Sequence, residues 1–138
     1  MIVLDTNIIS ELMRPAPSGR VIDWLDRQPP EAIWLTSISV LEIRFGLELL
    51  ADGARRLRLE QAFDAVLAQD LAERVLPFDT PAADHTARLA AAARRAGQSM
   101  ELRDAMIAGI ALCHGARLAT RNLRHFADTG IDLENPWQ

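Results

Sequence analysis

The sequence predicts an α/β fold whose central sheet is mainly parallel and covered by helices on both faces. Short apolar runs alternate along the chain with longer segments of helical periodicity, and parallel strands require crossover segments of this kind. The chain has 138 residues, an ordinary size for one domain, and we see no repeat, low-complexity tract or long linker in it. We therefore expect residues 1–138 to form a single domain.

The strands are expected where short apolar runs are bounded by breaks in the pattern. Four are predicted, and a fifth lies near the C-terminus: Ile2–Leu4, Ile33–Leu35, Val75–Phe78, Arg117–Ala119 and Ile131–Leu133. The segments between them are predicted helices: Asn7–Met13, Arg20–Arg27, Ser39–Ala51, Ala54–Ala68, Pro81–Ala96 and Glu101–His114. Pro15, Pro17 and Gly19 separate the first two helices. Thr80 is expected to cap the fifth.

Composition indicates the class of protein but no activity. Hydrophobic residues make up 49% and charged residues 25% of the chain, the balance of an ordinary globular protein. No apolar run approaches the roughly 18 residues of a membrane span, and the N-terminus lacks the basic region of a secretory signal. Cys113 is the only cysteine, so no internal disulfide can form. We expect a cytoplasmic protein that does not bind membranes.

Histidine spacing and net charge limit the classes of ligand. His85, His114 and His125 have neither HExxH nor Cys/His spacing, so we expect no zinc site. The formal net charge of −4 argues against non-specific binding to nucleic acid, for which basic domains are typical. That argument weakens if several acidic residues hold a metal ion, because the ion cancels part of their charge.

Three acidic residues occupy positions where a solvated surface charge is not expected, and Asp5 is the first. It directly follows the strand Ile2–Leu4 and precedes a predicted helix. Ligands of open parallel sheets bind at the carboxyl ends of strands, which makes Asp5 a candidate ligand. The alternative is that Asp5 simply caps the helix that begins near Asn7.

Glu42 lies on the face of its predicted helix that we expect to be buried. Its neighbours at helical spacing are mostly apolar, namely Ile38, Ser39, Phe45, Gly46 and Leu49. A buried carboxylate is costly unless something compensates its charge. A metal ion would do so, and so would a buried arginine partner; both remain open here.

Asp104 heads a similar inward-facing stripe. The stripe continues at spacings of three, four and seven residues with Ile107, Ala108 and Ala111. Asp104 also lies in the first turn of its helix, where the helix dipole favours an anion, so a capping role is its alternative. Arg103 points about a quarter-turn away and is not the expected partner of Asp104.

These three carboxylates come from three separate elements. If they converge, their mutual repulsion requires a cation. Oxygen ligands without sulfur or histidine suit Mg²⁺ or Mn²⁺, and an acidic site of this kind binds a phosphodiester and activates an attacking water. If the three carboxylates converge, they indicate a site for a hard divalent metal ion.

Several blocks of the sequence resemble PIN-domain toxins of the VapC type, in particular the FitB-like branch. They are Met1–Pro15, Ser39–Gly46, Leu76–Asp79, Arg103–Ala108, Ala119–Asn122 and the ending Asn135–Trp137, in the family's order and over nearly the whole chain. The resemblance implies a three-layer α/β/α PIN domain. It also implies the toxin of a type II toxin–antitoxin system, acting as an endoribonuclease that depends on Mg²⁺ or Mn²⁺. The partners it implies are RNA, a second copy of the chain and a cognate antitoxin, with which it assembles on operator DNA.

The resemblance assigns the family's core acids to Asp5, Glu42 and Asp104, which are the residues that position and periodicity also single out. It implies that Asp5 and Asp104 bind the metal directly. Glu42 would bind it too, orient a water or serve a second ion. Thr6 and Thr120 match hydroxyl positions that support the acids or contact phosphate.

Asn122 departs from the family pattern, because many relatives carry an aspartate there. Its amide oxygen can ligate or hold a water but brings no charge, so we expect weaker metal affinity or reliance on one ion until substrate arrives. Asn122 is the one feature that favours the alternative function, a catalytically weak PIN domain that acts as a binding module through its antitoxin or RNA. His125 is expected to be a surface histidine, with an RNA contact as its alternative. A phosphatase with Asp5 as nucleophile is disfavoured, since it would require an acid at Asn7.

Overall fold

The computed structural model describes residues 1–138 and contains a five-stranded, fully parallel sheet. Its strands are β1 (Ile2–Leu4), β2 (Ile33–Thr36), β3 (Val75–Leu76), β4 (Arg117–Ala119) and β5 (Leu133–Glu134). They follow the order β3-β2-β1-β4-β5, so β1 lies at the centre. The predicted parallel sheet is confirmed. The last strand starts later than expected, because β5 pairs with β4 only at Leu133 and Glu134.

Six α-helices are present: α1 (Thr6–Leu12), α2 (Gly19–Asp26), α3 (Ser37–Glu48), α4 (Ala54–Ala65), α5 (Thr80–Arg95) and α6 (Leu102–Cys113). Three short helical turns accompany them, η1 (Pro30–Ala32), η2 (Val66–Asp70) and η3 (Leu123–Phe126). All the predicted helices are found, but the cap of α5 is Asp79 and not Thr80. The Asp79 carboxylate accepts a hydrogen bond from the Ala82 N–H at 3.1 Å.

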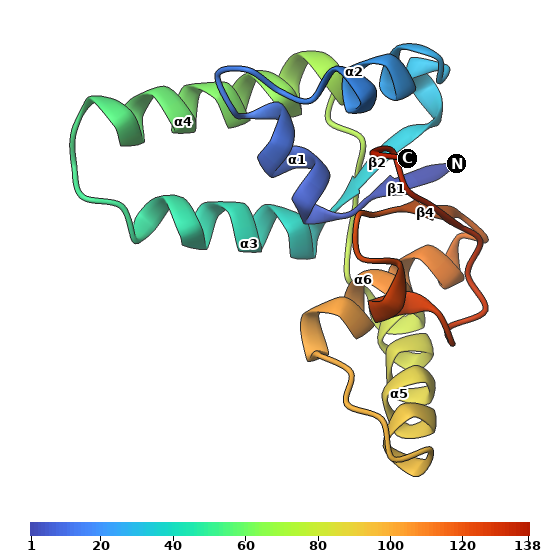
Figure 1. Ribbon diagram of the computed structural model, residues 1–138. Coiled ribbons are helices and arrows are strands. Elements are labelled where there is room, and N and C mark those ends of the chain that lie inside the picture. Colours follow the sequence, from blue (N-terminus) through green and yellow to red (C-terminus); the bar gives the residue numbers. More distant parts are fainter.

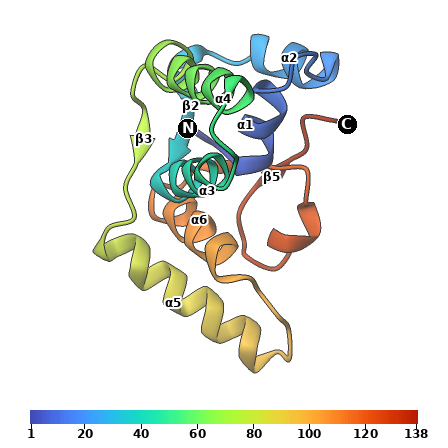
Figure 2. The ribbon, with the colours of Figure 1, turned by 90° about the vertical axis from the view of Figure 1, so that its left-hand side faces the viewer.

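The sheet separates two apolar cores and thereby forms the middle of three layers (Figure 1). Figure 2 shows α1, α2 and α4 on one side of the strands and α5 and α6 on the other. Ile2 and Leu4 of β1 belong to the first core, which includes Phe63 of α4. Val3 belongs to the second core, beside Leu118 of β4. Successive residues of β1 thus point to opposite faces, as in any strand, and the predicted three-layer α/β/α architecture is confirmed.

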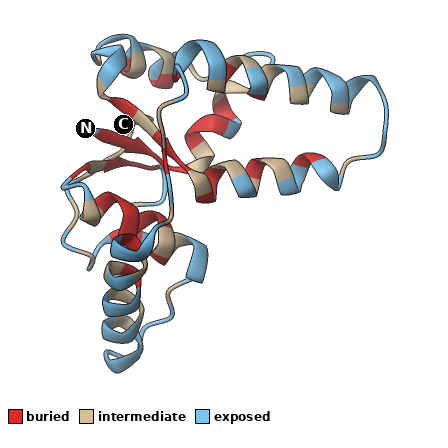
Figure 3. Cartoon of the chain, turned by 180° about the vertical axis from the view of Figure 1, so that it is seen from behind, coloured by how far each residue is buried: buried red, intermediate tan, exposed pale blue.

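Two helical parts project from this centre. The helices α3 and α4 form an antiparallel hairpin on one side, and α5 extends in another direction (Figure 1). Their outer portions are largely exposed, whereas the strands and the helix faces next to them are buried (Figure 3). No helix is both long enough and apolar enough to cross a membrane.

Candidate active site

Polar residues stand at the carboxyl ends of three neighbouring strands. Asp5 follows β1, Thr36 ends β2 and Thr120 follows β4. Parallel strands present their carboxyl ends at the same edge of a sheet, where ligands bind in folds of this class. The Thr120 hydroxyl accordingly donates a hydrogen bond to Oδ2 of Asp5 at 2.7 Å, although the two residues are far apart in the sequence.

Asp5 is a buried carboxylate that is held by donors from both sides. Its Oδ1 accepts a hydrogen bond from the Thr6 N–H at 2.8 Å, and its Oδ2 accepts one from the Asn7 side chain at 3.2 Å in addition to Thr120. Burial raises the pKa of Asp5, while the hydrogen bonds from Thr120 and Thr6 act in the opposite direction. Asp5 therefore does cap α1, and the cap fixes its carboxylate at the edge of the sheet.

Glu42 of α3 joins the same network through Thr6. The Thr6 hydroxyl donates to Oε1 of Glu42 at 2.8 Å and lies 2.8 Å from the Ser39 hydroxyl. Ser39 is fully buried one turn before Glu42. On the other side, Nη1 of Arg103 lies 3.7 Å from Oε2 of Glu42. The arginine partner that the sequence left open is therefore present, although this pair is not buried, since the Arg103 side chain is 48% exposed.

The apolar stripe around Glu42 is buried along only part of its length, contrary to our expectation. Ile38 and Ser39 are buried, but Phe45 and Leu49 are 56% and 71% exposed. Glu42 lies between these two parts of the stripe and is 22% exposed. The reason is that α3 leaves the sheet as part of the projecting hairpin, so no other element of this chain covers its outer face.

Asp104 lies in the first turn of α6, as predicted, and its side chain is 21% exposed. It does not cap the helix, because the Glu101 carboxylate does so by accepting a hydrogen bond from the Asp104 N–H at 3.2 Å. Oδ2 of Asp104 lies 3.1 Å from Nδ1 of His125. Burial raises the pKa of Asp104, and the charge of Asp5 and more weakly that of Glu42 raise it further. The three predicted acids thus share one electrostatic environment.

The three acids nevertheless do not form a complete set of ligands. No three Asp, Glu, His or Cys side chains are arranged so that they could hold a metal ion. The ligand atoms do fit Mg²⁺ or Mn²⁺ in kind, because Asp5 and Asp104 offer carboxylate oxygens. Burial and the charge of Asp5 both raise the pKa of Asp104, and a bound cation would offset this repulsion. Mg²⁺ commonly binds one or two carboxylates and keeps several waters.

Comparison with known proteins identifies the family. A family model described as "PIN domain" matches residues 2–131. The chain belongs to the PIN domain family. It is 41% identical over 138 residues to "VapC ribonuclease Y4jK" of Sinorhizobium fredii, covering 100% of this chain and 99% of the relative. It is 37% identical over 137 residues to "Toxin FitB" of Neisseria gonorrhoeae, covering 99% of each. The predicted relation to VapC-type toxins of the FitB-like branch is confirmed.

Solved structures agree with this assignment of the PIN domain. The crystal structure of FitAcB from Neisseria gonorrhoeae matches with a TM-score of 0.91 and 37% identity, over 100% of this chain and 99% of that one. The structure of DNA-bound VapBC from Salmonella typhimurium matches with a TM-score of 0.80 and 29% identity, over 98% and 97%.

Sequence analysis missed some residues of this PIN-domain site and could not place others. Glu101 was not predicted to cap α6, because glutamate is not among the residues that are preferred at helix N-caps. His125 is exposed, as predicted, but its contact with Asp104 had no local signal, because the two come from different elements. Asn122 is exposed, and it reaches the site only through its backbone N–H, which donates to Oγ1 of Thr120 at 3.0 Å.

Proposed function

We propose that this PIN domain, comprising residues 1–138, is a toxin that hydrolyses phosphodiester bonds of RNA with Mg²⁺ or Mn²⁺ as cofactor. The observation that carries the proposal is the hydrogen-bond network at the carboxyl edge of the sheet, in which Thr120 donates to Asp5 at 2.7 Å and Thr6 donates to Glu42 at 2.8 Å. Asp104 of α6 joins these acids electrostatically, since the charge of Asp5 raises its pKa. Similar relatives support a nuclease, among them "tRNA(fMet)-specific endonuclease VapC" of Salmonella typhimurium, 35% identical over 102 residues.

The side chains would divide the work of hydrolysis as follows. Asp5 and Asp104 are the proposed metal ligands, and the metal, when bound, supplies positive charge to the phosphate and lowers the pKa of an attacking water. Thr120 and the Thr6 N–H hold the Asp5 carboxylate in place. Thr6 also holds Glu42, which we assign to orienting the attacking water. The hydrogen-bond donors around these acids are in place before substrate binds. Such preorganisation is the usual source of electrostatic stabilisation in enzymes.

Asn122 has a smaller role in this proposal than an aspartate would have. Its side chain is exposed and hydrogen-bonds to no other group of the protein, so it is free to turn toward a bound water or the RNA. The same observation, together with the incomplete set of ligands, favours the alternative of a binding module that holds RNA or antitoxin without efficient cleavage. The two functions differ in whether a metal produces cleavage.

The proposed partners are a second copy of the chain, a cognate antitoxin and operator DNA. Leu41 and Phe45 of α3 and Leu49 at its C-terminal end are between 56% and 71% exposed, and we assign them to the homodimer contact. Related complexes support the other two partners: FitAB bound to an IR36 DNA fragment matches with a TM-score of 0.90 and 37% identity. With RNA as substrate, the protein would act in the cytoplasm.

The test is cleavage of a pool of cellular RNA by purified, antitoxin-free protein. Parallel reactions contain Mg²⁺, Mn²⁺ or EDTA, and the Asp104→Asn variant is the matched control. Discrete products that require a metal and disappear in the variant are the expected result. Folded protein that cleaves under none of these conditions would contradict the proposal and support the binding module.

A further inference from the structure

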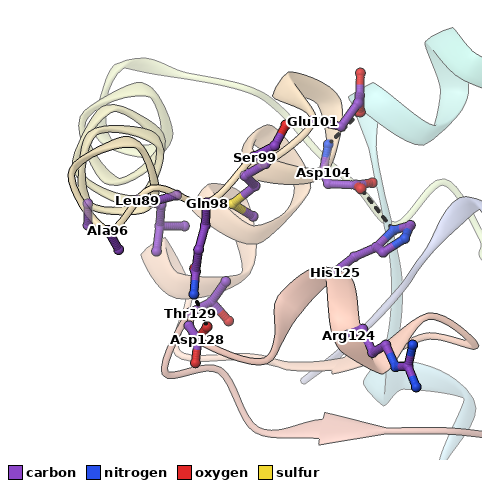
Figure 4. A pocket seen from close by; sticks show the side chains of 13 residues that line it. Leu89, Ala96, Gln98, Ser99, Glu101, Asp104, Arg124, His125, Asp128 and Thr129 are labelled. Carbon is purple, nitrogen blue, oxygen red and sulfur yellow. Dashed lines mark hydrogen bonds and ion pairs between the residues drawn. The ribbon is translucent and has the colours of Figure 1, made fainter.

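A cavity of about 810 Å³ lies beside the acidic residues (Figure 4). It is open on one side and bordered by the end of α5, the loop that follows, the start of α6 and η3 with the turn after it. Asp104 and His125 form the wall that it shares with the candidate active site, and Gln98 and Asp128 stand on the opposite side. Its volume falls in the range of about 300–1,000 Å³ that is typical of small-ligand sites.

The wall formed by Gln98 is fixed by the way in which α5 ends. Gly97 adopts φ +71°, a left-handed conformation that favours glycine. Its N–H donates to the Arg94 carbonyl at 3.1 Å, and the Gln98 N–H donates to the Ala93 carbonyl at 2.9 Å, which is the Schellman pattern of a helix end. The chain then turns so that Nε2 of Gln98 donates to Oδ2 of Asp128 at 3.1 Å.

The cavity combines an apolar floor with a polar rim. Its apolar lining consists of Leu89, Ala92, Ala93, Ala96 and Met100. Leu89 and Met100 also pack against the core between the sheet and α6, which holds the floor in place. An apolar surface bordered by hydrogen-bonding groups suits a nucleobase, which has apolar faces and polar edges.

Charge decides which part of a nucleotide would enter. Two carboxylates outside the proposed metal site border the cavity, those of Glu101 and Asp128, and they would repel a phosphate group. Arg124 lies on the rim, and its guanidinium points away from α5 (Figure 4). The phosphates would therefore stay outside, where Arg124 can reach them, and the base would point inward. The ring of His125 at the entrance offers a surface on which a base can stack.

We propose that this cavity receives one unstacked nucleotide of the RNA beside the cleaved bond, and that it prefers guanine; this inference rests on the proposed ribonuclease function. Ionised Asp128 can only accept hydrogen bonds, and its Oδ1 has no protein partner. The side-chain carbonyl of Gln98 is a second free acceptor. Guanine is the base whose Watson–Crick edge presents two adjacent donors, N1–H and the N2 amino group. The other three bases present one donor group beside an acceptor.

The inference is tested with short RNAs that carry a randomised single-stranded segment, whose cleavage sites are mapped by sequencing the product ends. The parent is expected to prefer guanine at one position beside the cut by about tenfold, the discrimination of one good bidentate contact. In Asp128→Asn that preference should fall to about twofold or less, because an amide replaces one acceptor by a donor. Asp52→Asn is the matched control, since Asp52 is fully exposed in the α3–α4 connection.

Two results would overturn the inference while leaving the ribonuclease intact. One is cleavage by the parent with no preferred base at any position beside the cut. The other is a preference that survives in both Asp128→Asn and Gln98→Ala, two exposed substitutions that are not expected to affect folding.

Binding is measured as well, so that the inference can be judged even if no RNA is cleaved. Guanosine 5′-monophosphate should bind the parent at least about fivefold more tightly than uridine 5′-monophosphate, and Asp128→Asn should remove the difference. Calorimetry or NMR titration gives both affinities. Equal affinities of the two nucleotides for the parent would contradict the assignment of this cavity.

Discussion

The helices α3 and α6 are alike in length and in the acid that each contributes, yet they are held in opposite ways. Both have 12 residues, and both carry a site carboxylate on an apolar stripe, Glu42 on α3 and Asp104 on α6. In α6 the stripe is buried throughout, because the helix lies between the sheet and α5. In α3 the stripe passes from buried to exposed along the helix. The same sequence pattern therefore places an acid beside a packed core or beside an uncovered surface, depending on the neighbouring layers.

The two acids differ correspondingly in how firmly they are held. Glu42 is bound by a hydroxyl network, in which Thr6 lies between it and the buried Ser39. The Asp104 carboxylate contacts only His125, whose side chain is 55% exposed, although the helix itself is packed between the sheet and α5. We infer that α3 holds its carboxylate through local contacts on a loosely covered helix, whereas α6 holds its carboxylate through the position of the helix.

The largest expected effect is the loss of cleavage when either acid is neutralised. Asp104→Asn and Glu42→Gln should each reduce the rate by at least about a thousandfold, which corresponds to roughly 4 kcal/mol in the activation barrier. Initial rates on an RNA substrate at saturating Mg²⁺ provide the measurement. Cleavage by Asp104→Asn at the parent rate would show that α6 does not contribute to the chemistry.

Folding of Asp104→Asn should be unimpaired or slightly improved. The pKa of Asp104 is raised in the folded protein, by burial and by the charge of Asp5. A carboxyl group that binds its proton more tightly when folded weakens the folded state at every pH above its ordinary pKa, near 3.8. The asparagine removes this effect, so the gain in the free energy of unfolding should be present at pH 7 and absent below about pH 4. Urea unfolding at both pH values measures it.

The next largest effect is a difference in the free energy of unfolding between alanine substitutions of one glycine in each helix. An added Cβ at Gly109 of α6 would lie 2.8 Å from the Ala82 carbonyl oxygen and closer still to the Thr86 hydroxyl, whereas at Gly46 of α3 it would meet nothing within 4 Å. Gly109→Ala should therefore reduce the free energy of unfolding by about 3 kcal/mol, because α5 must move away. Gly46→Ala should increase it by up to about 1 kcal/mol through helix propensity. If Gly109→Ala and Gly46→Ala had the same urea midpoint, the proposed difference in packing between α6 and α3 would be contradicted.

The sequence predicted those features of the fold and site that depend on local pattern. The strands, the helices and the positions of Asp5 and Asp104 follow from apolar periodicity and from the place of an acid at a strand end or in a first helical turn. The exposure of Phe45 could not be predicted, because it depends on which layer covers α3. The contact between His125 and Asp104 joins two separate elements and leaves no local trace in the sequence.

A smaller effect is expected from the exposed apolar residues of the two helices. Phe45 of α3 and Leu102 of α6 are 56% and 58% exposed, but only Phe45 lies in a row with other exposed apolar residues, Leu41 and Leu49. Phe45→Ser should raise the dissociation constant of the homodimer about tenfold, the loss of one good interface contact. Leu102→Ser should change it by less than about threefold. Sedimentation equilibrium measures both, and the reverse order would place the dimer contact on α6.

The smallest effect concerns Arg103, which links the two helices. Its guanidinium binds Glu101 of α6 at 3.1 Å and lies 3.7 Å from Glu42 of α3. The side chain is 48% exposed, and pairs of this kind contribute little to folding, so Arg103→Gln should leave the urea midpoint unchanged. The same change removes a positive charge beside Glu42 and should tighten Mn²⁺ binding by about twofold in calorimetry. Arg103→Lys, which keeps the charge, is the control. A clear fall in the midpoint of Arg103→Gln would instead show that this pair couples α3 to α6, and the two helices would no longer be held independently.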